Sequence, residues 1–241
     1  TDVLENDNAP QIDDQVLAID ENLANTSVVV DLNDANTGTD TDGDGDAISY
    51  SIISGNDKGA FVIDASSGVI GVADSAVLDR ESTDQFVLGV RASAKGDSDE
   101  AAITIDLNDL NDNAPVINSA ASASVAENST AVLTVMASDA DATAAHNSIA
   151  YRISGGIDQN LFQIDGASGA LSFKVAPDFE TPQDDGGDNL YNVQVTAGDG
   201  VNDTAQDIAV TVTDVLENDN APQIDNQVLA IDENLANTSV V

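Results

Sequence analysis

Short runs in which apolar and polar residues alternate recur along the whole chain. Alternation with a period of two places successive side chains on opposite faces of a half-buried strand. Gly, Asp, Asn and Ser separate the runs, and these residues favour turns. No stretch repeats its apolar residues with the period of a helix. The chain is therefore predicted to be all-β.

The alternating runs form two sets that follow the same order. In the first set we predict strands at residues 16–19, 28–32, 48–53, 61–63, 69–72, 86–92 and 101–107. In the second set we predict strands at residues 123–126, 132–137, 149–153, 162–164, 170–173, 191–197 and 206–212. Seven short strands in about 106 residues are typical of an immunoglobulin-like Greek-key sandwich, so we expect two such sandwiches end to end. The core candidates are Phe61, Ile63, Phe86, Leu88 and Val90 in the first and Phe162, Ile164, Val193 and Val195 in the second.

A segment at the start of the chain returns almost unchanged at its end. Residues 2–29 and 214–241 differ at one position, where Asp14 is replaced by Asn226. A compact single domain is not expected to contain the same segment twice, whereas a tandem array repeats its units. The predicted organisation is a linker at 1–9, a first domain at 10–114, a second domain at 115–221 and the truncated start of a third domain at 222–241.

The formal net charge of −38 narrows the range of partners. Nucleic acid is not expected as a partner, because the chain has no basic patch that could displace counterions from phosphates. An anionic membrane surface would repel the chain, and no apolar run is long enough for a transmembrane helix. The chain has no Cys, so disulfides cannot stabilise it. An apolar content of 41% still favours folded cores over disorder.

The acidic residues are unevenly chosen, with 36 Asp and only 8 Glu. Glu21, Glu127 and Glu233 recur at a spacing of 106 residues, and an Asn-Asp-Asn-Ala-Pro linker recurs with them. Junctions between stacked sandwiches would bring together acidic loops from both units, and these loops would repel one another without a cation. Calcium takes about six to eight oxygen ligands of this kind. Calcium is therefore the predicted cofactor and partner.

Several short motifs resemble those of the cadherin family. They are Ala-Glu-Asn-Ser at 126–129, Asp-Ala-Asp at 139–141, Leu-Asp-Arg-Glu at 78–81, Asp-Leu-Asn-Asp-Asn-Ala-Pro at 109–115, Ala-Gly-Asp-Gly at 197–200, and the matching stretches 61–70 and 162–171. Each string is weak alone, but the set in this order and at this period is specific. The resemblance covers essentially the whole chain. Long near-identical repeats are typical of large microbial adhesins, so bacterial cadherin-like domains of a surface or secreted adhesin are the expected relatives.

The resemblance implies a complete calcium joint between the two units, similar to the three-calcium junction of the family. Glu21, Glu81 and Asp112 would bridge two inner ions, and Asp139 and Asp199 would hold an outer one. The full implied set is the side chains of Glu21, Asp79, Glu81, Asn111, Asp112, Asp139, Asp141 and Asp199 and the carbonyl groups of Leu110, Asn113 and Asn147.

The resemblance implies weaker sites at the other two joints. The ligands implied after unit two, for one or two ions, are Glu127, Asp178, Glu180, Asn218 and Asp219. At the start of unit one, Asp34 and Asn36 align with Asp139 and Asp141, but Ala94 stands where unit two has Asp199. The outer ion of that joint would therefore lose a carboxylate.

Two further departures from the pattern affect the outer joints. The loop 40–46 starts like an EF-hand loop, but Ser51 occupies the place of its closing Glu. We therefore interpret residues 42–46 as a solvated acidic loop, and the alternative is a contribution to the outer calcium of the first joint. The outer linkers carry Leu4 and Leu216 at the position of Asp109 in the central linker. The resemblance implies that this Asp is not a direct calcium ligand, so its loss is expected to cost little.

The sequence argues against catalysis by what it lacks. It has no Cys nucleophile, no metalloprotease or serine-hydrolase motif and no phosphate loop, and its one His, His146, is expected to be solvated. We therefore do not expect an enzyme. The prediction is a calcium-stiffened segment of an extracellular or cell-surface protein that serves adhesion or surface extension. The alternative left open is a calcium-dependent module that binds a polysaccharide, or carbohydrate more generally, or another copy of itself.

Overall fold

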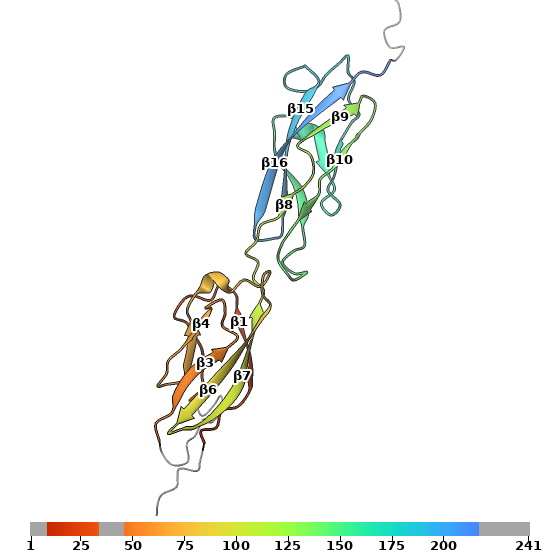
Figure 1. The fold of residues 1–241 in the computed structure, drawn as a ribbon. Coiled ribbons are helices and arrows are strands. Elements are labelled where there is room, and N and C mark those ends of the chain that lie inside the picture. Colours follow the sequence, from red (N-terminus) through yellow and green to blue (C-terminus); the bar gives the residue numbers. More distant parts are fainter. Residues whose placement is uncertain (1–8, 34–45, 217–241) are drawn as a thin grey trace, which may run out of the picture.

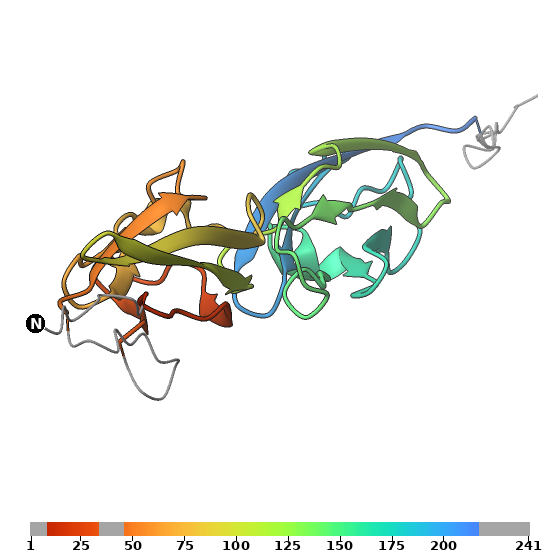
Figure 2. The same cartoon turned by 60° about the horizontal axis from the view of Figure 1, so that its bottom comes forward.

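The computed structural model describes residues 9–33 and 46–216, which form two elongated units placed end to end (Figure 1). The end-to-end order is also clear when the molecule is turned about the horizontal axis (Figure 2). Residues 109–115 link the units. Most of the predicted first linker and the predicted start of a third domain lie outside the described residues, and the predicted domain boundaries stay predictions.

Unit one is a sandwich of two sheets. Its elements are β1 (Gln15–Asp20), β2 (Val28–Asp31), β3 (Ser49–Ser54), β4 (Phe61–Ile63), β5 (Val69–Val72), the 3₁₀ helix η1 (Ser75–Val77), β6 (Gln85–Ala94) and β7 (Asp97–Asn108). One sheet has the strand order β1-β7-β6-β3 and the other β2-β5-β4. Strand β1 runs parallel to β7, and the other neighbours are antiparallel.

Unit two repeats this plan with small additions. Its elements are β8 (Val116–Ile117), β9 (Ser122–Ala126), β10 (Ala131–Thr134), β11 (Ala137–Ser138), β12 (Ala150–Gly155), the 3₁₀ helix η2 (Gln159–Leu161), β13 (Phe162–Ile164), β14 (Ala170–Phe173), β15 (Leu190–Gly198) and β16 (Asp203–Thr213). The sheets have the orders β12-β15-β16-β9, β10-β14-β13 and β11-β8. Strand β9 runs parallel to β16, as β1 does to β7. The predicted all-β tandem of immunoglobulin-like sandwiches is confirmed.

The predicted strand at 132–137 is wrong as a single strand, because the chain changes partner within it. Strand β10 pairs with β14 and has a register shift after Ala131. The backbone N–H of Val135 then donates to Gly169, and β11 pairs with β8 instead. The sequence pattern does not reveal such a switch, because Leu133 before it and Val135 after it both pack against the same core.

The predicted core residues lie inside the two sandwiches. Phe61 and Phe86 meet edge to face with ring centroids 5.2 Å apart in unit one. In unit two, Phe162 stacks on Phe173 at 4.5 Å, and both rings meet Tyr191 edge to face. Such aromatic pairs each contribute about 0.5–1.5 kcal/mol beyond the burial of their surface. Ile63 and Ile164 are only partly buried at the core margin, whereas the other predicted core residues are buried.

The ends of each sandwich, rather than its faces, carry the acidic loops. Strands β1 and β9 end immediately before Glu21 and Glu127, and the hairpin between β15 and β16 reaches the linker. In the part of the chain that the structure describes, no helix is long and apolar enough to cross a membrane.

Candidate metal centre

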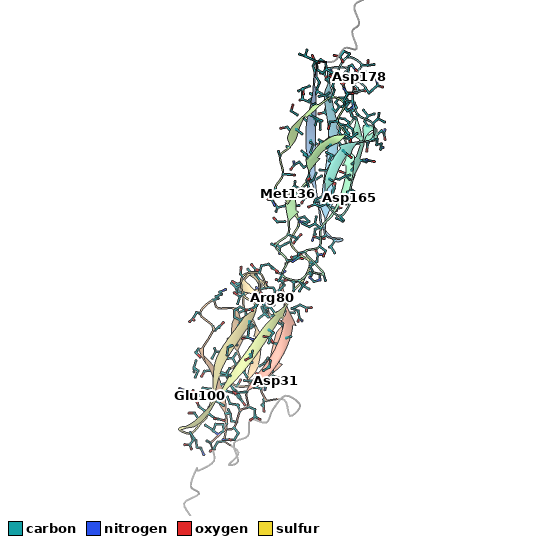
Figure 3. The ribbon with its side chains drawn as sticks, turned by 90° about the vertical axis from the view of Figure 1, so that its right-hand side faces the viewer. Asp31, Arg80, Glu100, Met136, Asp165 and Asp178 are labelled. Atoms are coloured by element: carbon teal, nitrogen blue, oxygen red, sulfur yellow. The ribbon has the colours of Figure 1, made fainter. Side chains whose placement is uncertain are left out.

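The linker between β7 and β8 is surrounded by loops from both units. Unit one contributes the turn after β1 and the loop after η1. That loop carries Arg80, which is labelled near the joint in Figure 3. Unit two contributes the loop between β11 and β12 and the hairpin between β15 and β16. These loops hold most of the residues predicted for calcium, so sequence segments far apart meet at one place.

Glu21 is the buried anchor on the side of unit one. Its side chain is 1% exposed, although it carries a carboxylate. Its two oxygens accept the backbone N–H groups of Arg80 and Leu110, each at 2.7 Å. Hydrogen bonds from backbone N–H groups stabilise a buried carboxylate in its charged form. Glu21 therefore fixes the loop after η1 and the start of the linker relative to β1.

A first cluster consists of Glu21, Glu81 and Asp109, whose carboxylate oxygens lie within 4.8 Å of one another. Partial withdrawal from water raises the pKa of Glu81 to about 7, and the neighbouring Asp109 and Glu21 carboxylates add to this rise. Three carboxylates this close cannot all remain charged at low cost unless a cation joins them. The cluster therefore has the chemistry of a cation site.

Asp109 differs from its expected minor role. Its side chain is 3% exposed, and it binds the loop of unit two through four contacts. The N–H groups of Ala142 and Thr143 and the Thr143 hydroxyl donate to it at 2.9, 3.0 and 2.6 Å. Nδ1 of His146 lies 2.7 Å from Asp109 Oδ2, so His146 is a partner at the joint rather than a solvated side chain.

These hydrogen bonds also affect the charge of Asp109. Burial by itself would raise the pKa of the Asp109 carboxyl, but the donors from Thr143, Ala142 and His146 hold that pKa well below its usual range. Asp109 therefore stays charged and holds the linker to unit two through hydrogen bonds, and its carboxylate also lies beside that of Glu81.

A second cluster crosses the joint. Glu81 of unit one, Asp112 of the linker and Asp141 of unit two bring carboxylate oxygens within 4.8 Å of one another. Asp112 also accepts hydrogen bonds from the amide groups of Asn22 and Asn113. An open cleft of about 230 Å³ adjoins this cluster and is lined by Asn22, Ala76, Asp79, Glu81, Asp112 and Asn113.

Asp79 stands apart from the clusters although it lines the cleft. Its oxygens accept hydrogen bonds from the N–H group and the hydroxyl of Ser82 at 3.1 and 3.0 Å. These contacts fold the turn that presents Glu81. The structure therefore places Asp79 beside the candidate centre without bringing it into a three-carboxylate group.

A third cluster lies within unit two and consists of Asp139, Asp141 and Asp199. One oxygen of each carboxylate is occupied: Asp139 accepts from the Asp141 N–H group, Asp141 from Asn113, and Asp199 from the N–H groups of Val201 and Asn202. The other oxygen of each, Oδ2, is buried and has no hydrogen-bond partner. Burying an unsatisfied carboxylate oxygen is costly. Three such oxygens at one point mark the place where a cation fits.

The hydrogen bonds around Asp199 influence its ionisation. Burial alone would raise the pKa of the Asp199 carboxyl, but hydrogen bonds from Asn202, Val201 and Asn111 outweigh burial and lower it. Asp199 therefore stays charged while its second oxygen remains without a hydrogen-bond partner.

The amide and carbonyl groups of the linker converge on the same region. Asn202 directs its side-chain nitrogen at three oxygens, Asn111 Oδ1 at 2.8 Å, Asn113 O at 3.0 Å and Asn111 O at 3.3 Å. Asn147 donates to the Asp141 carbonyl at 2.9 Å. The sequence prediction missed Asn202, whose only sequence signal is its position three residues after Asp199 in the same hairpin loop.

The far end of unit two carries a further cluster of Glu127, Asp178 and Glu180. Glu127 is buried and accepts the N–H groups of Phe179 and Val215, each at 2.8 Å. Asp178, labelled at this end in Figure 3, accepts the N–H group of Thr181. Asn218 and Asp219, predicted for this joint, and Asp34 and Asn36, predicted for the first joint, lie outside the described residues.

Comparison with known proteins places both units in one family. The family model described as "Cadherin domain" matches residues 15–108 and 121–216. Rat Cadherin-23 is 31% identical over an alignment 256 residues long, gaps included. The alignment covers 98% of this chain and 7% of that protein. Mouse Protocadherin Fat 4 is 39% identical over 187 residues, which cover 73% of this chain and 4% of that protein.

Solved structures agree with this result. The crystal structure of mouse Cadherin-23 EC22-24 is similar with a TM-score of 0.69 and 28% identity, over 87% of this chain and 66% of that chain. Human Protocadherin-24 EC1-2 has a TM-score of 0.67 at 22% identity, over 86% of this chain and 99% of that chain, and so supports the fold alone. These relatives are mammalian, and the expected bacterial affiliation stays a prediction.

Proposed function

Because the chain belongs to the cadherin family, we propose that its central joint binds calcium and that calcium stiffens the two repeats into one rod. The chain itself is a tandem of cadherin repeats from an adhesion-type protein that is extracellular or at the cell surface. It spans only 7% of the length of rat Cadherin-23, so the partner and the role of the whole protein are part of the proposal. Its relatives are adhesion proteins rather than enzymes.

The observation that carries the proposal is the third cluster. Asp139, Asp141 and Asp199 each leave Oδ2 buried without a hydrogen-bond partner. Calcium prefers carboxylate oxygens and accepts flexible arrangements of them. A bound calcium ion would supply the missing partner to all three oxygens and offset their mutual repulsion. The donor set consists of oxygens without Cys or His, which fits calcium better than zinc or copper.

The three central clusters account for most of the predicted ligands. Glu21, Glu81 and Asp109 would hold one ion, Glu81, Asp112 and Asp141 a second, and Asp139, Asp141 and Asp199 a third. Glu81 and Asp141 each belong to two clusters, so they would link neighbouring ions. The carbonyl groups of Leu110, Asn113 and Asn147 and the side chains of Asn111 and Asp79 remain predicted additional ligands.

The expected stiffening of the joint follows from the three segments that supply the second cluster. The second cluster draws one carboxylate each from unit one, the linker and unit two. Without a cation, three negative charges would push these segments apart. With a cation, the same three segments are tied to one point, so bending at the linker would have to break metal–oxygen bonds. Ion binding to the folded joint also stabilises the fold by mass action.

The two alternative functions, carbohydrate binding and self-association, differ in the support that they receive. Carbohydrate or polysaccharide binding gains no support, because the family is one of adhesion proteins. Among the described residues there is no Trp, and the aromatic rings are buried or partly buried rather than exposed for stacking on sugars. Self-association with another copy agrees with the family and stays a prediction for the whole protein.

Isothermal titration calorimetry with calcium tests the proposal directly. Asp199→Asn keeps an oxygen that can accept the turn hydrogen bonds but removes the charge, so it should weaken binding at the third cluster about tenfold or more. Asp57→Asn, at an exposed position outside the clusters, should leave binding unchanged. No calcium heat in the unaltered protein, or equal behaviour of the two variants, would contradict the proposal.

A further inference from the structure

The N-terminal end of unit one carries a loop that matches the Asp199 loop of unit two in length but not in chemistry. Ser93 pairs with Ser98 across the β6–β7 hairpin, and Gly198 pairs with Asp203 across the β15–β16 hairpin. The residues enclosed are Ala-Lys-Gly-Asp at 94–97 in unit one and Asp-Gly-Val-Asn at 199–202 in unit two. The two four-residue hairpin tips therefore occupy equivalent places, although in unit one Ala94 still pairs with Asp97 and only Lys95 and Gly96 lie outside the strands.

In unit two this loop completes the third cluster. Asp199 contributes one of the three buried carboxylate oxygens without a partner, and Asn202 directs its amide group at the linker oxygens. In unit one, Ala94 at the equivalent position has no side-chain oxygen to offer. Unit one therefore lacks one carboxylate that a third cluster would need.

A lysine supplies a positive charge at this end of unit one. Lys95 Nζ lies 2.5 Å from Asp46 Oδ1. Asp46 stands four residues before Tyr50, and Asn147 stands four residues before Tyr151. Tyr50 and Tyr151 pair with Ala92 and Ala197 at matching places in the two sheets. Lys95 thus contacts the unit-one counterpart of the segment that holds Asn147 beside Asp141.

The ion pair is built into the fold. The Asp46 side chain is only 15% exposed, and its second oxygen is buried without a hydrogen-bond partner, so the lysine is the charge that compensates it. Lys95 has φ of 43° and Gly96 has φ of 111°, which gives the tight two-residue turn with positive φ at both positions. Such turns favour Asn-Gly, because a side chain such as that of lysine rarely adopts this left-handed conformation. The lysine is held in an unfavourable backbone conformation where its ammonium group meets Asp46.

We infer that the Lys95 ammonium group replaces the outer calcium ion at the N-terminal end of unit one. This inference rests on the proposed function, since it assumes that calcium occupies the third cluster of unit two. A calcium ion bound to the same loops would lie close to a fixed positive charge and would lack the Asp199 carboxylate. The joint before unit one would accordingly bind one ion fewer than the central joint.

A reciprocal loop exchange tests the inference on the whole chain. In one variant, residues 94–97 become Asp-Gly-Val-Asn; in the other, residues 199–202 become Ala-Lys-Gly-Asp. The first should bind one calcium ion more than the unaltered chain, and the second one ion fewer, as counted by calorimetry with calcium alone. If the second loses an ion and the first gains none, the inference is wrong while the proposed function stands. If the unaltered chain binds no calcium, the proposed function itself fails.

A second measurement needs no calcium. In the presence of a chelator, Lys95→Met should lower the melting temperature of unit one by several degrees, because it leaves the Asp46 carboxylate buried without a counter-charge. Lys95→Arg keeps the charge and should change the melting temperature less than half as much. Calcium should raise the melting temperature of the Lys95→Met variant by no more than it raises the melting temperature of the unaltered chain. Equal melting temperatures for the Met variant and the unaltered chain would overturn the inference.

Discussion

The central joint and the far end of unit two share one scaffold and differ in what surrounds it. Glu21 and Glu127 each follow the first long strand of their unit, and each is buried. Each accepts one N–H group from a loop of its own unit and one from the linker that follows. This anchor is therefore built by a single unit and its own linker.

The difference lies in the linker and in the neighbouring unit. Asp109 of the central linker is buried and holds unit two through four contacts, whereas Leu216 at the corresponding place is 98% exposed. Taken together, the three central clusters draw carboxylates from both units and from the linker, while the far end of unit two has one cluster with all three carboxylates from unit two. The anchor belongs to one repeat, but a complete centre is a property of a pair of repeats.

The largest expected effect comes from Asp141, because its carboxylate belongs to two of the central clusters. Asp141→Asn should weaken calcium binding at the central joint by about a hundredfold or more, since two ions lose a charged ligand. The matched control is Asp178→Asn, which affects one cluster at the far end and should leave the central joint intact. Calorimetry measures both, and equal losses in the two variants would remove the distinction between the joints.

The shared anchor predicts a matched loss of stability. Glu21→Gln keeps the shape but removes the charge and one acceptor oxygen, so it should destabilise calcium-free unit one by about 1.5–3 kcal/mol. Glu127→Gln should cost unit two a similar amount, because its two hydrogen bonds are alike. Urea unfolding in a chelator measures both. In the presence of calcium, the loss of unfolding free energy caused by Glu21→Gln should exceed the loss caused by Glu127→Gln. A Glu21→Gln variant that is as stable as the unaltered protein in the chelator would contradict the role of the anchor.

Asp109 offers a direct exchange between the two joints. Asp109→Leu installs the residue found in the other linker and removes four contacts to unit two, so calcium affinity at the central joint should fall about tenfold. The imidazole resonances of His146 should shift at the same time, which a loss of stability elsewhere would not produce. Leu216→Asp is the control and should leave the central joint unchanged. Unaltered affinity in Asp109→Leu would show that Asp109 has no part in the centre.

The smallest expected effect is a dependence on pH. The pKa of Glu81 is raised to about 7, so calcium-free protein below that pH holds a proton on Glu81 that calcium must displace. Calcium affinity at the central joint should therefore fall as the pH decreases below 7, by at most about tenfold per pH unit for a single proton. Titrations at pH 6 and 8 in buffers of different ionisation enthalpy measure the released proton. Glu81→Gln should remove this dependence, and an affinity that is the same at both values in the unaltered protein would contradict it.

Local features of the molecule could be predicted from the sequence. Strand positions follow from alternation within a few residues, and the cadherin-like motifs pointed to Glu21, Glu81, Asp112, Asp139, Asp141 and Asp199, whose carboxylates the structure brings into clusters. The features that escaped prediction depend on contacts between distant segments. The change of partner between β10 and β11 requires β8, which has only two residues.

The same reason explains the missed residues of the joint. Asn202 meets Asn111 across 91 positions of sequence, and an isolated Asn in a hairpin carries no signal of such a contact. The ties of Asp109 to Thr143 and His146 likewise exist only once unit two has docked on the linker. A motif identifies the residues that a repeat brings to a joint, and the structure shows which of them meet across it.

The most direct test is an anomalous diffraction map of crystals grown with calcium. We predict strong anomalous peaks at the central joint, one of them contacting the Oδ2 atoms of Asp139, Asp141 and Asp199 and others beside Glu81. The far cluster of Glu127, Asp178 and Glu180 should show weaker density or none when no further unit is docked on it. A central joint without an anomalous peak between Glu81, Asp112 and Asp141, under saturating calcium, would contradict the central claim that these two repeats are joined by calcium.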